Sequence, residues 1–423
     1  MEDSPPVHRR RHRRQPLGVI MLAGLAAAGC VGAGADELTV AQATTAVTET
    51  VVATTEAATT TTTATTVETT TTTVETTTTT PPVPSDQRTL EKVADLTGDL
   101  SSKSVVASQT GLYIAQNMMY RHTISVFDAD KSLVATVPDS VDLAAFGHDV
   151  PSGSYQGAPV EAAFGSTGQF AYVSNYRMYG QGFNADPGDS CNNDEGDPSY
   201  VYRLDLSKVA DPSAVIDRAY LVGSVPKYVA VSPDDRLLLV TNWCTFDLSV
   251  IDLTTETTVA TIELGRHPRG LAITSDSARA YVTVMGGSDI AIVDLATFEL
   301  DWMKGVGQSP RHLVLSPDDT TLYATLNGEG RVIKIDLASR QVVDRVSTGI
   351  APRSMAISAD GTALYVVNYE SNTMSKVRTS DFEILQNLDT AHHPIGITYD
   401  SFNDEVWVAC YSGVIHVFAD RAE

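Results

Sequence analysis

The chain has 423 residues, of which 43% are hydrophobic and 19% charged, and its formal net charge at pH 7 is -23. A surface this acidic repels polyanions, so nucleic acid and anionic lipid are not expected as general partners.

Residues 1–29 are expected to be a signal peptide. Five arginines precede an apolar run over residues 17–29, which is too short for a comfortable membrane span. The run ends in Ala27-Ala28-Gly29-Cys30, which resembles the lipobox of bacterial lipoproteins. The resemblance implies cleavage before Cys30, lipidation of its thiol, and anchoring to the extracytoplasmic face of a cell membrane. An ordinary secretory signal is the alternative.

Residues 30–85 are predicted to be a disordered linker. Threonine dominates this stretch, and neither an aromatic nor a basic residue lies between Cys30 and Arg88. Such a composition cannot bury a core. We expect a tether that holds the folded part away from the membrane, and its threonine and proline content is typical of an O-glycosylated stalk.

A repeat of 42 residues organises the rest of the chain. Five prolines lie at this fixed spacing, and each begins an apolar run: Pro226, Pro268, Pro310, Pro352 and Pro394. Within the unit from Pro268 to Ser309, four short apolar segments are expected as strands, over residues 270–274, 280–284, 289–295 and 300–306. Four strands per repeat predict the blade of an all-β propeller.

The second strand of each unit carries a recognisable motif. It reads Tyr-Val-Ser-Asn at 172–175, Leu-Val-Thr-Asn at 239–242, Tyr-Val-Thr-Val at 281–284 and Tyr-Val-Val-Asn at 365–368. With the turns and prolines around it, this pattern resembles the YVTN family of β-propeller repeats over about four-fifths of the chain. The resemblance implies a propeller with a binding or surface role and no shared chemistry.

Seven units are expected in the propeller, which is assigned to residues 86–423. Weaker copies begin at Ser102 and Pro159, and the last unit, from Pro394, has room for only three strands. Residues 88–94 resemble its missing fourth strand. An N-terminal strand would therefore close the ring and remove an open sheet edge.

Three cysteines follow Cys30. Cys191 and Cys244 fall in corresponding loops of neighbouring units, and we expect a disulfide between them in an exported protein. Cys410 falls inside a strand and is expected to be a small core residue.

One face of the propeller is expected to carry the function. Two insertions, residues 139–157 and 176–199, fall on the face where the innermost strands begin, and elaborated loops commonly carry function. Cations and histidines gather at the same mouth: Lys227, Arg269, Arg311, Arg353, His267, His312, His392 and His393. They indicate a site for a carboxylate or phosphate. In the alternative, each arginine pairs with an aspartate of the next blade.

Two groups of residues are candidates for metal binding. The acidic insertion offers hard oxygens for calcium at Asp186, Asp189, Asp194, Glu195 and Asp197, or is simply a solvated loop. Seven-bladed copper enzymes line this region with histidine, but His267 and His393 belong to units three blades apart, which argues against a transition-metal site. No cofactor is required by this interpretation, and calcium is the one considered.

The function expected from the sequence is that of a binding module. Its partner is an unknown protein, a glycan or an anionic small molecule, and nearby aromatic residues such as Tyr176 and Trp243 suit a sugar or peptide. The alternative is a propeller-type hydrolase or lyase acting on an anionic small molecule. The chain has no H-E-x-x-H, G-x-S-x-G, C-x-x-C or phosphate-loop motif. Binding of single-stranded DNA is a third possibility, which the charge disfavours.

Overall fold

The computed structural model describes residues 82–183, 188–191 and 196–422. All of these belong to one compact unit, Thr78–Glu423. The expected signal peptide, the lipidation site Cys30 and almost the whole linker lie outside the described residues. Within the described part, no helix is long and apolar enough to cross a bilayer.

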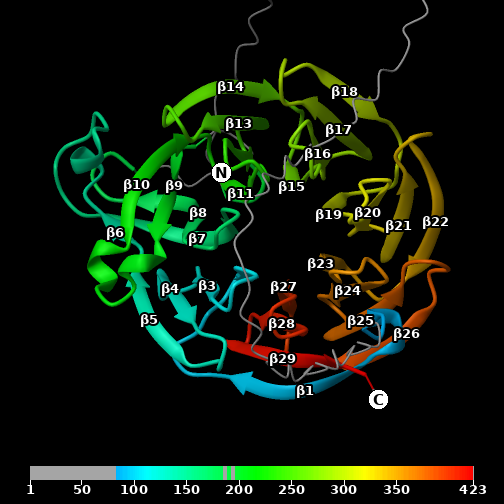
Figure 1. Cartoon of the computed structure of the whole chain (residues 1–423). Helices are drawn as coiled ribbons and strands as arrows, with labels where there is room; N and C mark the ends of the chain where they lie inside the picture. The colour runs from blue at the N-terminus through cyan, green and yellow to red at the C-terminus, as the bar shows by residue number, and fades with distance from the viewer. Residues whose placement is uncertain (1–81, 184–187, 192–195, 423) are drawn as a thin grey trace, which may run out of the picture. The chain divides into compact units, whose positions relative to one another are not determined.

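Seven β-sheets follow one another in a ring, which confirms the seven-bladed all-β propeller (Figure 1). The first three blades comprise β2 (Ser104–Ala107), β3 (Tyr113–Asn117), β4 (Thr123–Phe127) and β5 (Leu133–Pro138); β6 (Ser140–Val141), β7 (Tyr155–Phe164), β8 (Phe170–Tyr179), β9 (Ser199–Asp205) and β10 (Ile216–Val222); β11 (Pro226–Val231), β12 (Leu237–Asn242), β13 (Asp247–Asp252) and β14 (Thr257–Glu263). The next three comprise β15 (Pro268–Ile273), β16 (Arg279–Val284), β17 (Asp289–Asp294) and β18 (Leu300–Met303); β19 (Pro310–Leu315), β20 (Thr321–Leu326), β21 (Arg331–Asp336) and β22 (Gln341–Ser347); β23 (Pro352–Ile357), β24 (Ala363–Asn368), β25 (Thr373–Arg378) and β26 (Ile384–Asp389). The seventh contains β27 (Pro394–Asp400), β28 (Glu405–Cys410), β29 (Val414–Arg421) and β1 (Thr89–Leu96), and four short 3-10 helices occur at Ser85–Gln87, Leu143–Phe146, Leu206–Lys208 and Pro212–Ala214.

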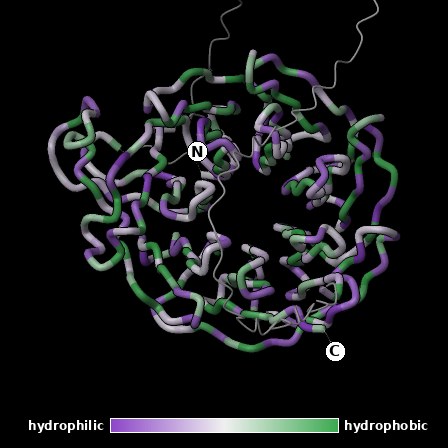
Figure 2. Tube along the Cα trace, in the orientation of Figure 1, coloured by the Kyte–Doolittle hydropathy of each residue, from purple (hydrophilic) through white to green (hydrophobic). Residues whose placement is uncertain are grey.

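Burial changes from the inner to the outer strands of a blade. Every residue of β12, β24 and β28 is buried, whereas β14 and β22 alternate between exposed and half-buried positions. Middle strands pack on both faces against neighbouring blades, so they are buried along their whole length, while an outer strand turns one side to solvent. Figure 2 shows the mixed hydropathy of the outer strands around the rim.

The innermost strands β2, β7, β11, β15, β19, β23 and β27 contact one another in that order around the ring. They enclose a cavity of about 210 Å³, to which six of the seven contribute lining residues. We call this space the central channel. The end at which the innermost strands begin is its mouth.

The N-terminal strand closes the ring as expected. β1 pairs antiparallel with β29, from Thr89 opposite Arg421 to Leu96 opposite Ile415. The strand begins one residue later and ends two residues later than the expected 88–94. Residues before β1 also take part in the closure. The buried Ser85 donates its backbone N–H to the Asp360 carboxylate, 2.7 Å away.

A buried ion pair stabilises this closure. The Lys376 ammonium donates to Asp420 Oδ1 at 2.6 Å and to the backbone carbonyl of Arg88 at 2.7 Å, and both charged side chains are 0% exposed. Tyr365 donates to the other Asp420 oxygen, Oδ2, at 2.7 Å. Because Lys376 lies on β25, the segment before β1 holds the sixth and seventh blades together.

The second blade differs from the expected four strands. Its sheet has five, because the two-residue β6, inside the first insertion, pairs with the start of β7. The two insertions pack on each other, with the rings of Tyr155 and Phe183 at 5.7 Å between centroids. This lobe extends beyond the ring beside β6 (Figure 1).

Candidate anion site at the channel mouth

Five cations begin the innermost strands at the channel mouth. They occupy the second position of five of the seven repeat units and form what we call the cation ring: Lys103, Lys227, Arg269, Arg311 and Arg353. Val160 and Ile395 stand at the equivalent place in the other two units. Lys103 was not among the predicted residues, because its unit starts with Ser102 instead of proline. The sequence could have identified Lys103, because it directly follows the first residue of its unit, as the other four cations do.

The five cations converge on one space. Burial, together with the charges of other ring members, lowers the pKa values of Lys103, Arg269 and Arg311. Arg269 is 9% exposed and Arg311 5% exposed. Like charges that lower one another's pKa values must lie close together in a poorly solvated space.

The three arginines have no carboxylate within ion-pair distance in the described part of the chain, although the charges of Glu161 and Asp189 are near enough to oppose the lowering of the pKa of Arg269. Arg269, Arg311 and Arg353 form no ion pair there, and the Nε atoms of Arg311 and Arg353 are enclosed without a hydrogen-bond partner. The alternative in which each arginine pairs with an aspartate of the next blade is therefore not what the described residues show. The guanidinium of Arg353 instead lies 3.7 Å from the ring centroid of Tyr369.

An aromatic rim surrounds the cation ring. Trp243, Tyr369 and Tyr411 directly follow the second strand of their blades, and Tyr176 takes the same repeat position within β8. The Lys227 ammonium lies 4.3 Å from the ring centroid of Tyr176 and 5.3 Å from that of Trp243, and the Lys103 ammonium donates to the Tyr411 hydroxyl at 2.5 Å. Such contacts stabilise a cation whose hydration has been reduced without neutralising it.

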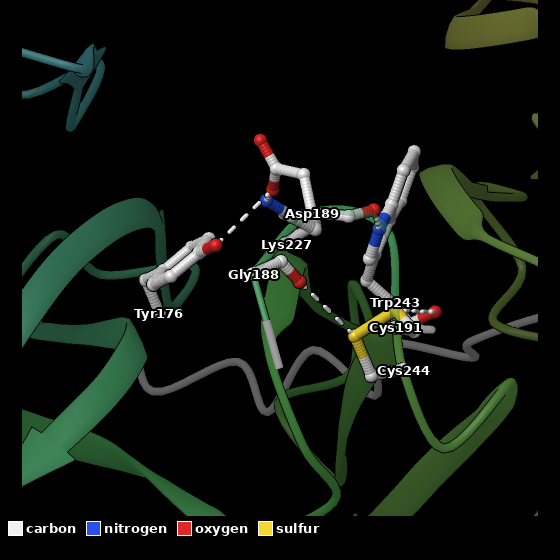
Figure 3. Close-up of a disulfide and its surroundings, with 7 residues drawn as sticks. All are labelled: Tyr176, Gly188, Asp189, Cys191, Lys227, Trp243 and Cys244. Atoms are coloured by element: carbon white, nitrogen blue, oxygen red, sulfur yellow. Dashed lines mark hydrogen bonds and ion pairs between the residues drawn. A yellow bond between two sulfur atoms is a disulfide. The ribbon is translucent and has the colours of Figure 1, made fainter. Parts of the chain in front are cut away.

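A disulfide holds one carboxylate at the mouth (Figure 3). Cys191 of the second insertion is bonded to Cys244, as the sequence analysis expected. Between the rings of Tyr176 and Trp243, Asp189 ion-pairs with Lys227 at 2.6 Å, and its backbone carbonyl accepts from Trp243 Nε1 at 2.7 Å. Burial lowers the pKa of Lys227 to about 7, against the opposing effect of Asp189. Although burial opposes it, Lys227 lowers the pKa of Asp189 to about 2.

Two of the mouth histidines have structural contacts. His267 and His393 each precede a repeat proline and adopt positive φ angles of 62° and 54°, where the chain turns into an innermost strand. The ring of His267 stacks on Trp243 at 4.2 Å, and that of His393 stacks on Tyr369 at 4.0 Å. Among the described residues, no three His, Cys, Asp or Glu side chains are grouped so that they could hold a metal.

The calcium hypothesis rests mainly on residues outside the described ones, namely Asp186, Asp194 and Glu195. Of the five carboxylates, Asp189 and Asp197 are described, and Asp189 is engaged by Lys227. Calcium binding therefore stays a prediction.

A second level of polar groups lies deeper in the channel, one residue further along the innermost strands. It comprises Ser104, Glu161, Tyr228, His312 and Ser354, all of which line the 210 Å³ cavity. Glycine replaces them on β15, where a Cβ at Gly270 would lie 2.6 Å from the Arg311 carbonyl oxygen. The Tyr228 ring extends toward His312, with 5.3 Å between ring centroids.

Glu161 is the acid of this deeper level, and the sequence analysis missed it. Ser104 of the neighbouring blade donates to Glu161 Oε1. Burial raises the pKa of Glu161 to about 7, against the lowering effects of Ser104 and Arg269. Burial and the nearby Arg269 and Arg311 lower the pKa of His312 to about 3, so its imidazole is neutral at physiological pH.

The far end of the innermost strands has a different character. A cavity of about 430 Å³ there is lined largely by apolar residues, including Val106, Phe164, Val231 and Ile273, and by no charged side chain. Of these two cavities, only the one nearer the mouth has charged side chains beside it that could bind an anion.

Comparison with known proteins supports the fold alone. No family model and no curated protein matches the sequence. Among solved structures, hydrazine synthase of Kuenenia stuttgartiensis is similar, with 15% sequence identity and a TM-score of 0.59, over 78% of this chain and 98% of that one. Membership of the YVTN family and the lipoprotein type stay predictions.

Proposed function

We propose that the protein is a lipid-anchored, extracytoplasmic binding module whose cation ring captures an anionic ligand at the channel mouth. The observation that carries the proposal is the set of three arginines, Arg269, Arg311 and Arg353, that form no ion pair among the described residues. Cations that are removed from water and left unpaired cost several kcal/mol each. An anion held between them would offset that cost.

The expected ligand group is a carboxylate, phosphate or sulfonate. Guanidinium groups bind such oxyanions through two parallel hydrogen bonds, and the aromatic rim shields the contact from water. The anion belongs to a small molecule, a glycan or a side chain of a protein partner. Anchoring through Cys30 and the threonine-rich linker would present the mouth outside the membrane.

The test measures anion binding with the chain 30–423 carrying Cys30→Ser. Sulfate, phosphate and citrate are titrated by calorimetry and by thermal shift. The double variant Arg269→Gln/Arg311→Gln should weaken binding at least about tenfold, since a hydrogen bond to a charged group contributes about 1.5–3 kcal/mol.

The matched control is Arg331→Gln/Arg345→Gln, which removes the same charge from β21 and β22, on the outer side of the fifth blade. It should bind anions as the parent does. Failure of every anion to bind the parent chain, or equal binding by the two double variants, would contradict the proposal.

A hydrolase or lyase acting on an anionic small molecule is the second candidate. It is favoured by Glu161, whose raised pKa suits proton transfer beside the cation ring. Only this candidate predicts turnover of a bound anion that Glu161→Gln abolishes while binding persists.

A further inference from the structure

Glu161 presents an unused acceptor to the central channel. Its Oε1 accepts from the Ser104 hydroxyl and lies 3.4 Å from the backbone N–H of Ala162. Its Oε2 has no hydrogen-bond partner among the described residues, and it is not one of the enclosed polar atoms that lack a partner. Because Glu161 lines the 210 Å³ cavity, Oε2 is open to that space.

The other polar groups of the deeper level are neutral, and the charges near Glu161 are those of Arg269 and Lys103 in the cation ring, which lower its pKa against the effect of burial. Tyr228 lies close enough for the charge of Glu161 to raise its pKa further, after burial, and His312 is neutral because its pKa is lowered to about 3. The Tyr228 hydroxyl has no partner among the described residues, and His312 Nδ1 is enclosed without one. The deeper level therefore offers one carboxylate amid uncharged polar groups, directly beneath five cations.

The cation ring and the deeper level favour ligand groups of opposite charge. A purely anionic ligand would satisfy the cation ring and would be repelled by ionised Glu161 below it. A ligand that also carries a positively charged donor would satisfy both levels.

We propose that the ligand of the cation ring is bipolar, with its anionic group bound by the ring and an ammonium group bound by Glu161 Oε2 inside the channel. This inference rests on the proposed function and names its ligand class, a small zwitterion. Consecutive residues of a strand rise about 3.3 Å, so a spacer of a few carbons connects the two levels. The cavity has the volume of roughly seven water molecules at about 30 Å³ each, enough for a short aminoalkyl chain.

The test compares two ligands that differ in one heavy atom. 3-Aminopropane-1-sulfonate and butane-1-sulfonate have equal length and a permanently ionised sulfonate, and only the first ends in an ammonium. Calorimetry with the chain 30–423 carrying Cys30→Ser should show the aminosulfonate binding at least about tenfold more tightly. The variant Glu161→Gln should remove this preference and leave butane-1-sulfonate binding equal or tighter.

The controls separate the possible failures. Glu263→Gln, which removes an exposed carboxylate from β14, should keep the preference. Equal binding of the two ligands by the parent chain, or a preference that survives in Glu161→Gln, would overturn the inference. Binding of neither ligand would overturn the proposed function instead.

A second measurement uses the parent chain alone, so it does not depend on whether a variant folds. An ammonium beside Glu161 favours its ionised form, so the aminosulfonate should release more protons on binding at pH 7 than the alkyl sulfonate does. Calorimetry in buffers of different ionisation enthalpy measures this difference. Equal proton release by the two ligands would contradict placement of the ammonium at Glu161.

Discussion

At the residue scale, the proposed anion binding is expected to depend on pH through Lys227. Burial lowers its pKa to about 7, so ammonium and amine coexist near neutrality. A bound anion favours the ammonium and therefore raises this pKa. Glu161, with a pKa raised to about 7, acts in the same direction, because its ionisation as the pH rises adds a negative charge below the ring.

Sulfate affinity should therefore fall as the pH rises from 6 to 8. Sulfate keeps a constant charge over this range, and each of the two groups contributes a loss of up to about tenfold. Calorimetric dissociation constants at intervals of half a pH unit check this.

The variant Lys227→Met should weaken sulfate binding at pH 6 and flatten the pH profile. Lys304→Met is the matched control, since Lys304 also pairs with an aspartate, Asp289 at 3.0 Å, but its side chain is 63% exposed. A parent profile that is flat between pH 6 and 8 would contradict the assignment.

The same residues show how much of the candidate site could be predicted from the sequence. The period of 42 residues identified Lys227, Arg269, Arg311 and Arg353, because equivalent repeat positions in a propeller come together around one axis. Glu161 was missed because its raised pKa comes from burial in the folded channel, and its partner Ser104 lies 57 residues earlier in the chain. Repeat spacing carries no information about such a contact. The free acceptor Oε2 likewise exists only in the folded channel.

At the element scale, closure of the ring depends on the segment that precedes the first blade. A chain that starts at Thr97 lacks β1 and the Arg88 carbonyl, which leaves β29 as an open edge and the buried Lys376 with one partner fewer. It also lacks Leu90, which is 3% exposed.

We expect the chain starting at Thr97 to be destabilised by at least about 3 kcal/mol, or to aggregate through the open edge. A chain starting at Ser85 keeps all of these contacts and should melt like the chain 30–423. Thermal unfolding followed by circular dichroism checks both. Equal melting temperatures for the chains starting at Ser85 and Thr97 would show that closure by β1 contributes little to stability.

Regular elements were predictable from the repeat, and inserted ones were not. The expected strand over residues 280–284 corresponds to β16, and that over 289–295 to β17, within one residue at either end. The two-residue β6 was not expected, since it exists only because the first insertion folds back onto β7. No local pattern of apolar residues specifies so short a strand.

At the scale of the whole molecule, an acidic protein carries a basic mouth. Residues 86–423 contain 24 basic and 44 acidic residues, a net charge of -20. An anion far from the mouth is repelled by this net charge, whereas one inside the mouth is held by the cation ring. The Debye length decides which field an approaching anion meets, because it is about 30 Å at 0.01 M ionic strength and about 8 Å at 0.15 M.

Removing distant negative charges should therefore strengthen anion binding at low ionic strength alone. The triple variant Glu263→Gln/Glu299→Gln/Asp344→Asn neutralises three exposed carboxylates on the outer side of blades three to five. Each contributes about 0.1–0.2 kcal/mol of repulsion toward a dianion. The affinity for sulfate should rise about twofold at 0.01 M and stay unchanged at 0.15 M.

Anions of the buffer compete equally with sulfate in parent and variant, so the ratio of the two dissociation constants isolates the long-range field. An equal change at both ionic strengths would indicate an altered mouth instead, and no change at either would mean that the cation ring alone sets the potential that the ligand meets.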